Sequence, residues 1–291
     1  MLYHININGK LTSVKNARIS IFDHGFLYGD SVYETLVTYD GRPFYLKEHL
    51  KRLERSAKAI HIKPTWSSEK YEKEILKTLK KFQKLKKEAI VRIMLTRGEG
   101  DIGLDPDLCK KPNNIILAWE FKGYPQKYYK KGINLHIVSV RRNAPNALNP
   151  AIKSCNFLNN ILAFIEAKNK GAFDGVMLNQ KGYVTEGTTS NIFIVKNNVL
   201  LTPKLETGIL SGITRKLVFE LCRKNNINAK EANITAQDVL RADECFITST
   251  TKEVMPVSSC NGKKINQGGV RPLTKTLIHL YREHVNKVLG H

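Results

Sequence analysis

Two kinds of periodic segment alternate along this chain of 291 residues, and a break after residue 120 separates them into two groups. Short alternating or β-branched runs are typical of strands, and longer runs with apolar residues three and four apart are typical of helices. The break, FKGYPQKYYKKG at residues 121–132, contains Gly, Pro and charge but no apolar period, as linkers do. The sequence therefore predicts an α+β protein of two domains, residues 1–120 and 133–291, joined by a linker at 121–132.

The order of elements within each group can also be predicted. In the first group we expect strands at 4–10 and 31–46, turning at Asp40-Gly41, then helices at 47–60 and 69–87, and strands at 89–97 and 113–120. In the second group we expect helices at 157–171, 212–225 and 272–288. Its strands are predicted within 174–203, with turns at Lys181-Gly182 and Asn197-Asn198, and at 244–250 and 254–265.

The net charge of +21 and the pI near 9.7 raise the question of a nucleic-acid partner, because clustered Lys and Arg release counterions from phosphate backbones. Between residues 69 and 87, however, the apolar positions recur at helical spacing, at Tyr71, Ile75, Leu79, Phe82 and Leu85. The lysines between them then lie on the solvent face of an amphipathic helix. We therefore expect no nucleic-acid partner.

The cysteines and the apolar pattern indicate the cellular compartment of the protein. The five cysteines are widely scattered and form no CxxC pair: Cys109, Cys155, Cys222, Cys245 and Cys260. This pattern predicts reduced thiols, with neither a disulfide framework nor a metal site. The sequence has no run of about 18 apolar residues and no signal-peptide layout. We expect a cytoplasmic protein that does not span a membrane.

A glycine pattern resembles a dinucleotide-binding fingerprint but lacks its context. Gly98, Gly100 and Gly103 spell GxGxxG after a predicted strand. The fingerprint requires its last glycine to open a helix, whereas Pro106 and Pro112 follow here within about ten residues. The sequence predicts a hairpin loop, not a nicotinamide or flavin site.

One lysine, Lys153, stands in NPAIKSCNFLNN between a proline-broken segment and an apolar helix. The features downstream of it suit a phosphorylated aromatic aldehyde that is bound covalently. Glu186 ends a strand directly before Gly187, so its carboxylate can bond a ring nitrogen and hold it protonated.

Two further stretches offer donors for a phosphate. In LSGITRK a glycine leads into a helix, where the backbone N–H groups of Ile213 and Thr214 favour an anion. In ITSTTKE the hydroxyls of Ser249, Thr250 and Thr251 lie between a strand and a turn. Each feature alone is weak, and their order along the chain is what gives them weight.

Six ordered stretches resemble blocks of the class IV aminotransferase superfamily of pyridoxal phosphate (PLP) enzymes: FDHGFLYGDSVYE, EHLKRLERSAK, NPAIKSCNFLNN, VTEGTTSNIFIV, TGILSGITR and FITSTTKEVMPV. The superfamily includes branched-chain aminotransferases, D-amino-acid aminotransferases and aminodeoxychorismate lyases. The resemblance implies fold type IV, with a small N-terminal α/β domain and a larger C-terminal mixed β-barrel-like domain, and it implies a homodimer.

The resemblance also implies roles for single residues. Lys153 matches the lysine that bonds the cofactor and carries the proton, Glu186 the partner of the pyridine nitrogen, and Arg52 a bidentate phosphate ligand. The other implied cofactor contacts are Leu210 on the ring and Ile213, Thr214 and Thr250 on the phosphate.

The substrate positions depart from both main branches. Val37 replaces an arginine common in branched-chain enzymes, and Ile102 and Leu104 stand where a D-specific enzyme carries Arg-x-His. The candidates left for holding the substrate carboxylate are Tyr33, Thr250, Thr251, and Arg92 or Arg97. We expect transamination between an amino acid and a 2-oxo acid, with D-amino acids slightly favoured over branched-chain L-amino acids. The alternative is an aminodeoxychorismate lyase, which releases pyruvate with the same lysine and cofactor.

Overall fold

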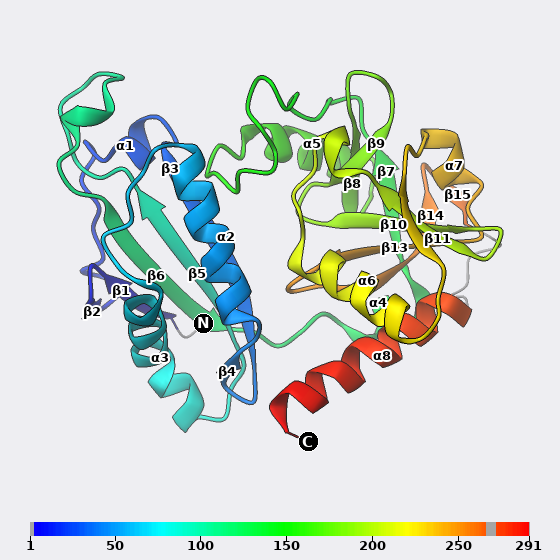
Figure 1. Cartoon of the computed structure of the whole chain (residues 1–291), viewed down its shortest axis with the longest axis horizontal. Coiled ribbons are helices and arrows are strands. Elements are labelled where there is room, and N and C mark those ends of the chain that lie inside the picture. Colours follow the sequence, from blue (N-terminus) through cyan, green and yellow to red (C-terminus); the bar gives the residue numbers. More distant parts are fainter. Residues whose placement is uncertain (1–2, 266–271, 291) are drawn as a thin grey trace. The chain divides into compact units, whose positions relative to one another are not determined.

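The computed structural model describes residues 3–265 and 272–290, and these form two compact units (Figure 1). Unit 1 contains the described residues up to Lys122 together with Ile152–Asn156. Unit 2 contains Gly123–Ala151 and the described residues from Phe157 onward. In these described parts no helix combines the length and the apolar character needed to cross a membrane.

Unit 1 is built on a six-stranded sheet with the order β2-β1-β6-β5-β3-β4, and its pairings are antiparallel. Its strands are β1 (Tyr3–Ile7), β2 (Lys10–Thr12), β3 (Ser31–Tyr39), β4 (Arg42–Pro43), β5 (Ala89–Thr96) and β6 (Asn113–Glu120). The predicted turn at Asp40-Gly41 joins β3 to β4, and both residues have positive φ, 49° and 68°. The predicted turn and the strands expected at 31–46, 89–97 and 113–120 are confirmed. The single strand expected at 4–10 is wrong, because Asn8 and Gly9 have positive φ and turn the chain between β1 and β2.

Two helices, α2 (Leu46–Ala59) and α3 (Ser68–Lys84), pack on one face of this sheet (Figure 1). Every second residue of the central strands points toward them, as the period of a strand requires. The resulting core combines Leu50 and Leu53 of α2 and Ile75 and Leu79 of α3 with Ile93 of β5. The lysines of α3 lie outside this core, as the helical period predicts.

The glycine-rich loop contains no helix that could hold a pyrophosphate. A short helix, α1 (His24–Leu27), precedes β3, and the 3₁₀ turn η1 (Pro106–Leu108) follows the glycines. Gly98 carries a φ of 106°, and a Cβ there would lie 1.9 Å from the carbonyl oxygen of Lys111. The loop therefore folds back on its own stem between β5 and β6, as expected for a hairpin.

Unit 2 contains a nine-stranded mixed sheet with the order β12-β11-β10-β13-β14-β7-β8-β9, in which β15 also pairs with β14. The sheet curls into a half-barrel. Its strands are β7 (Ile133–Ile137), β8 (Asp174–Leu178), β9 (Val184–Gly187), β10 (Asn191–Lys196), β11 (Val199–Pro203), β12 (Ala229–Ala232), β13 (Glu244–Ser249), β14 (Glu253–Cys260) and β15 (Lys263–Lys264). Its helical segments are α4 (Gln126–Lys131), α5 (Leu158–Asn169), η2 (Leu205–Thr207), α6 (Ile213–Lys224), α7 (Ala236–Leu240) and α8 (Pro272–Leu289).

The stretch expected to be a linker is partly helical. Residues 126–131 form α4, and Tyr128 and Tyr129 pack against the core of unit 2. The tyrosines give the stretch an apolar side, but a helix of six residues is too short to show a periodic pattern. The division between the units lies at Lys122–Gly123, so α4 belongs to unit 2.

Candidate active site

Lys153 lies in a short extended segment that pairs with the start of β3. Tyr33 N donates to Lys153 O at 2.9 Å, and Cys155 N donates to Ser31 O at 2.9 Å. The neighbouring strand β4 is only two residues long and covers the other end of β3, which leaves this edge open for the pairing. Ser56 of α2 accepts from Lys153 N at 3.1 Å. The backbone of the lysine is therefore fixed within unit 1.

The amine of Lys153 contacts an aromatic hydroxyl. Its Nζ lies 3.1 Å from Tyr33 Oη and 4.3 Å from the centroid of that ring. The guanidinium of Arg92 lies 4.8 Å from the same centroid. Among the described residues, no carboxylate lies within ion-pair distance of Lys153 Nζ. The amine is thus oriented without being held by a counterion, which suits a nucleophile.

A buried ionic cluster lies on the opposite face of β3. Glu34 is fully buried and points toward α2, because neighbouring residues in a strand face opposite ways. Its Oε1 accepts from Arg52 Nε at 2.6 Å, and its Oε2 from Arg52 Nη2 at 2.9 Å and His49 Nδ1 at 2.7 Å. This arrangement is a bidentate arginine–carboxylate pair extended by a histidine.

Burial and charge act in opposite directions on this cluster. Burial alone would raise the pKa of Glu34, but the charges of Arg52 and His49 and their hydrogen bonds hold that pKa below its ordinary value. Burial lowers the pKa of His49, and this outweighs the opposite effect of Glu34. The structure therefore commits much of the Arg52 guanidinium to Glu34, and its implied phosphate contact stays a prediction.

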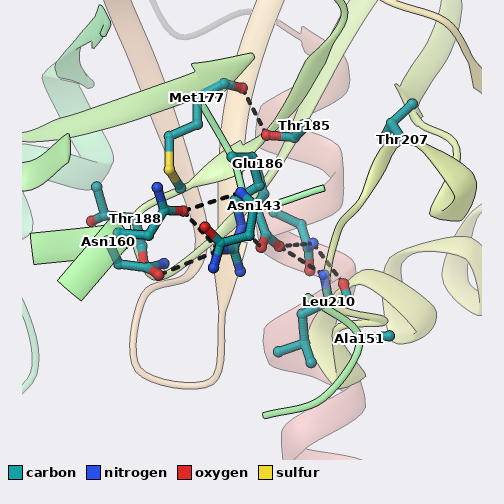
Figure 2. Close-up of polar contacts among 12 residues, drawn as sticks. Asn143, Ala151, Asn160, Met177, Thr185, Glu186, Thr188, Thr207 and Leu210 are labelled. Atoms are coloured by element: carbon teal, nitrogen blue, oxygen red, sulfur yellow. Dashed lines mark hydrogen bonds and ion pairs between the residues drawn. The ribbon is translucent and has the colours of Figure 1, made fainter. Parts of the chain in front are cut away.

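Unit 2 holds a second buried carboxylate, Glu186, at the end of β9 (Figure 2). Its Oε1 accepts from Arg142 Nε at 3.0 Å, and its Oε2 accepts from Leu210 N at 2.9 Å. Asn191 Nδ2 lies 3.4 Å from the same Oε2 and donates to Leu210 O at 2.9 Å. These donors orient the carboxylate, and Arg142 pairs with its charge.

Arg142 is held in turn by the asparagines that begin α5. Its Nη1 lies 3.0 Å from Asn159 Oδ1 and 3.5 Å from Asn160 Oδ1. Asn160 Nδ2 donates to Thr188 O, which follows Glu186 in the chain (Figure 2). Three segments far apart in the sequence therefore fix the position of one carboxylate.

The N-terminus of α6 lies beside this carboxylate. Its N-cap is Gly212, which has no side chain to cap the first N–H groups of the helix. A Cβ at Gly212 would lie 2.0 Å from Asn191 Oδ1. The glycine thus allows the helix to begin directly against the residue that contacts Glu186.

The remaining predicted residues divide between the units. Arg97 donates to both carboxylate oxygens of Asp30 and to the carbonyls of Ile60 and His61, which favours a structural role. Thr250 and Thr251 belong to unit 2, where they are half-buried in the 250–252 turn between β13 and β14.

Residues 31–260 match the sequence model of the family described as amino-transferase class IV. The chain belongs to the class IV aminotransferases. It is 43% identical over 279 residues to a Methanocaldococcus jannaschii protein whose name assigns it provisionally as a branched-chain-amino-acid aminotransferase, covering 96% of this chain and 95% of that one.

Two other relatives and one solved structure widen this comparison. A D-alanine aminotransferase of Bacillus licheniformis is 35% identical, with 93% of each chain covered, and an aminodeoxychorismate lyase of Bacillus subtilis is 33% identical, with 98% and 96% covered. The T.th. branched-chain amino acid aminotransferase, complexed with N-(5'-phosphopyridoxyl)-L-glutamate, matches with a TM-score of 0.91 and 29% identity, covering 98% of this chain and 94% of that one. The predicted fold type, enzyme class and PLP cofactor are confirmed.

The residues of this class IV aminotransferase fit PLP on the chemistry of their donors. An aldehyde requires an amine such as Lys153, a protonated ring nitrogen requires a buried carboxylate such as Glu186, and a phosphate requires N–H donors such as those at a helix N-terminus like that of α6. The close packing of Gly212 on Asn191 brings the last two of these features together within unit 2.

Sequence reasoning missed the partners of these groups. Glu34, Arg142 and Asn191 were not predicted as site residues, yet each contacts one that was. His49 was not predicted either, and it contacts Glu34. The signal for Glu34 was present, because a charged residue lies on the same strand face as Val32 and Leu36 of the core.

Proposed function

We propose that Lys153 of this aminotransferase bonds the aldehyde carbon of PLP and, once released by the amino substrate, moves a proton to and from the substrate α-carbon. The observation that supports this most is the Lys153 amine, which contacts the Tyr33 hydroxyl at 3.1 Å and has no ion-pair partner among the described residues. When bound, PLP supplies an electron sink for the bond being broken.

The other residues hold the cofactor. Glu186 bonds the ring nitrogen, and Arg142 keeps that carboxylate ionised and oriented. Leu210 packs on the ring, while the N–H groups of Ile213 and Thr214 bind the phosphate. Further phosphate contacts come from Thr250 and Arg52, and in the latter case the guanidinium is aligned by Glu34.

The substrate carboxylate is bound by Tyr33, Arg92 and Thr251. Arg92 supports this role because its guanidinium stacks on Tyr33, whereas Arg97 is engaged by Asp30. Ile102 and Leu104 are 75% and 87% exposed and bring no charge to the substrate, and neither does Val37. Such a site suits amino acids with apolar side chains. The 43% identity to the archaeal relative supports branched-chain L-amino acids, while Tyr33 and the hydroxyls keep D-amino acids as the second candidate.

A panel of amino donors tests this proposal. Single-turnover changes in cofactor absorbance are followed with L-leucine, L-valine, D-alanine and D-glutamate, and 2-oxoglutarate and pyruvate serve as acceptors. We expect reaction with L-leucine and L-valine. Reaction with the D donors alone would make the protein a D-amino-acid aminotransferase. Pyruvate release from aminodeoxychorismate without transamination would make it an aminodeoxychorismate lyase.

Peptide mapping tests the role of Lys153 separately. Borohydride reduction of the PLP-loaded enzyme is expected to fix the cofactor on the peptide that contains Lys153. Lys181, an exposed lysine in the turn before β9, provides the matched control, since Lys181→Ala should keep the label in place. A label on any other lysine contradicts the assignment.

We also propose a homodimer, in which loop 98–106 serves the neighbouring subunit. Unusually apolar exposed surface supports this, since α5 exposes Leu158, Ile161, Leu162, Phe164 and Ile165, each 43–67% accessible. Unit 1 exposes Ile21, Phe22, Phe26, Ile102 and Leu104 in a similar way. Light scattering coupled to size-exclusion chromatography should give twice the chain mass, and Leu162→Lys should lower it. A monomer at micromolar concentration contradicts the proposal.

A cytoplasmic location is the last part of the proposal. All five cysteines are free thiols, as a reducing compartment keeps them. Thiol labelling in native lysates checks this, and recovery of disulfide-linked protein contradicts it.

A further inference from the structure

A buried ammonium joins two turns of unit 2. Lys252 ends the 250–252 turn, and only 6% of its surface is exposed. Its Nζ donates to Thr189 Oγ1 at 2.5 Å and lies 3.6 Å from Asp174 Oδ2. Thr189 belongs to the 188–190 turn, which connects the end of β9, with Glu186, to β10. Lys252 therefore links the turn that carries the two threonines to the turn that follows Glu186.

Asp174, the first residue of β8, organises the 188–190 turn. Its Oδ1 accepts from Thr188 N at 3.2 Å and from Thr188 Oγ1 at 2.5 Å, and its Oδ2 accepts from Ser190 Oγ at 3.1 Å. A Cβ at Gly187 would lie 2.3 Å from Ser190 Oγ, so the turn closes tightly around the carboxylate. The charge at its centre is the one that faces the ammonium of Lys252.

Burial makes a surface role for Lys252 untenable. A lysine is rarely buried to this extent unless its charge is paired, because removing an ammonium from water is costly. In return, a buried pair with one partner on each of two elements fixes their register. The other contacts of Lys252 are through its backbone, from its N to Ser249 Oγ at 3.2 Å and from Tyr129 Oη to its O at 3.3 Å. The side chain is thus the part that ties the 250–252 turn to Asp174 and Thr189.

The 250–252 turn needs such a restraint. Glu253, which directly follows it, has a φ of 54°, a conformation that costs free energy in a residue other than glycine. Thr250 and Thr251 are half-buried and depend on this backbone for the direction of their hydroxyl and N–H groups.

We propose that Lys252 is a positioning residue that holds Thr250 and Thr251 in place to bind the cofactor phosphate and the substrate carboxylate. This inference rests on the proposed function. Both substrates of a transamination carry the same carboxylate, so loosening the turn weakens the binding of the amino donor and of the 2-oxo acid together. The amine of Lys153 and the carboxylate of Glu186 are untouched, so turnover at saturation changes little.

Steady-state kinetics of the PLP-saturated enzyme test the proposal. Lys252→Met keeps the unbranched side chain and removes the ammonium, and Thr189→Val is the milder change should Lys252→Met fold poorly. We expect KM to rise roughly tenfold for donor and acceptor alike, with kcat within about threefold. Lys252→Arg should recover most of the loss, and Lys181→Met, the exposed control, should match the wild type.

Amide hydrogen exchange gives a readout that does not depend on turnover. Peptides that cover 188–190 and 250–253 should exchange faster in Lys252→Met and Thr189→Val but not in Lys181→Met. Unchanged KM with unchanged exchange overturns the proposal, as does a loss of thermal stability with no change in KM. A wild-type enzyme that transaminates no donor overturns the proposed function instead, and the exchange rates then still decide whether Lys252 links the two turns.

Discussion

Replacing Glu34 with glutamine removes the negative charge that Arg52 and His49 share. The side chain of Glu34 is fully buried and that of Arg52 is 7% exposed, so water can replace little of the lost attraction. The amide oxygen can still accept from Arg52, and its NH₂ group can face the other tautomer of His49. What is lost is the counterion of a buried guanidinium, which typically costs about 3–5 kcal/mol.

Urea unfolding measures this effect in unit 1 alone, because Trp66 and Trp119, the two tryptophans of the chain, both belong to that unit. At an m value of about 2 kcal/mol/M, the midpoint seen by tryptophan fluorescence should fall by roughly 1.5–2.5 M. Glu54→Gln, on the exposed side of α2, is the matched control and should change the midpoint little. A midpoint for Glu34→Gln within about 0.3 M of the wild type would refute the assigned ion pair.

The same cluster contributes to the response of unit 1 to acid. The folded-state pKa values of Glu34 and His49 lie below their ordinary values of 4.5 and 6.5. In both cases the unfolded chain takes up the proton first as the pH falls, so stability is lost in the acid direction. The loss should begin below pH 6.5 with His49 and steepen below pH 4.5 with Glu34. Glu34→Gln should make the second stage shallower without abolishing it, because the pKa of Glu74 in the same unit, despite its burial, is also lowered, to about 2, by its hydrogen bonds to Lys70, Asn6 and Lys77.

Three further changes test the site. Lys153→Ala should abolish transamination while leaving the fluorescence-monitored urea midpoint of unit 1 within about 0.5 M of the wild type, and residual turnover above background would show that another group moves the proton. Glu186→Gln should keep the cofactor but slow the half-reactions by roughly 10- to 100-fold, since a charge-assisted partner contributes about 1.5–3 kcal/mol. Unchanged stopped-flow rates would contradict its role. Gly212→Ala should weaken PLP binding because its Cβ would meet Asn191 Oδ1 at 2.0 Å, and an unaltered dissociation constant in equilibrium dialysis would show that α6 does not hold the phosphate.

Local patterns made most of the fold predictable. The alternation around Val32 and Leu36 and the turn at Asp40-Gly41 are set by neighbours in sequence, and the structure confirms both. Helix α4 was missed because six residues carry no measurable period, and only its packing on the core of unit 2 stabilises it.

The candidate site was predictable only in part. Lys153 and Glu186 could be predicted as site residues because their neighbours along the chain resemble family blocks. Arg142 was missed because it lies in an irregular segment and meets Glu186 across 44 positions of sequence. A contact of that length arises because the segment of Arg142 bonds to the end of β8, which pairs with β9, and no window of sequence contains it. A role for Arg52 could be predicted from the sequence, but Glu34, the counterion that orients its guanidinium, could not be predicted.

The short segment that carries Lys153 also constrains how such an enzyme can be recombined. Residues 152–156 belong to unit 1, although the residues on both sides of them belong to unit 2. Neither unit is therefore a single stretch of chain, and one crossover cannot exchange either of them whole. A chimera that took residues 1–122 from a relative would keep the native Lys153 but place it beside the β3 strand of the relative. That strand would have to supply the backbone hydrogen bonds made at positions 31 and 33 and the hydroxyl of Tyr33. The edge of β3 and the segment that carries Lys153 must therefore be exchanged together, although they lie in two separate parts of the sequence.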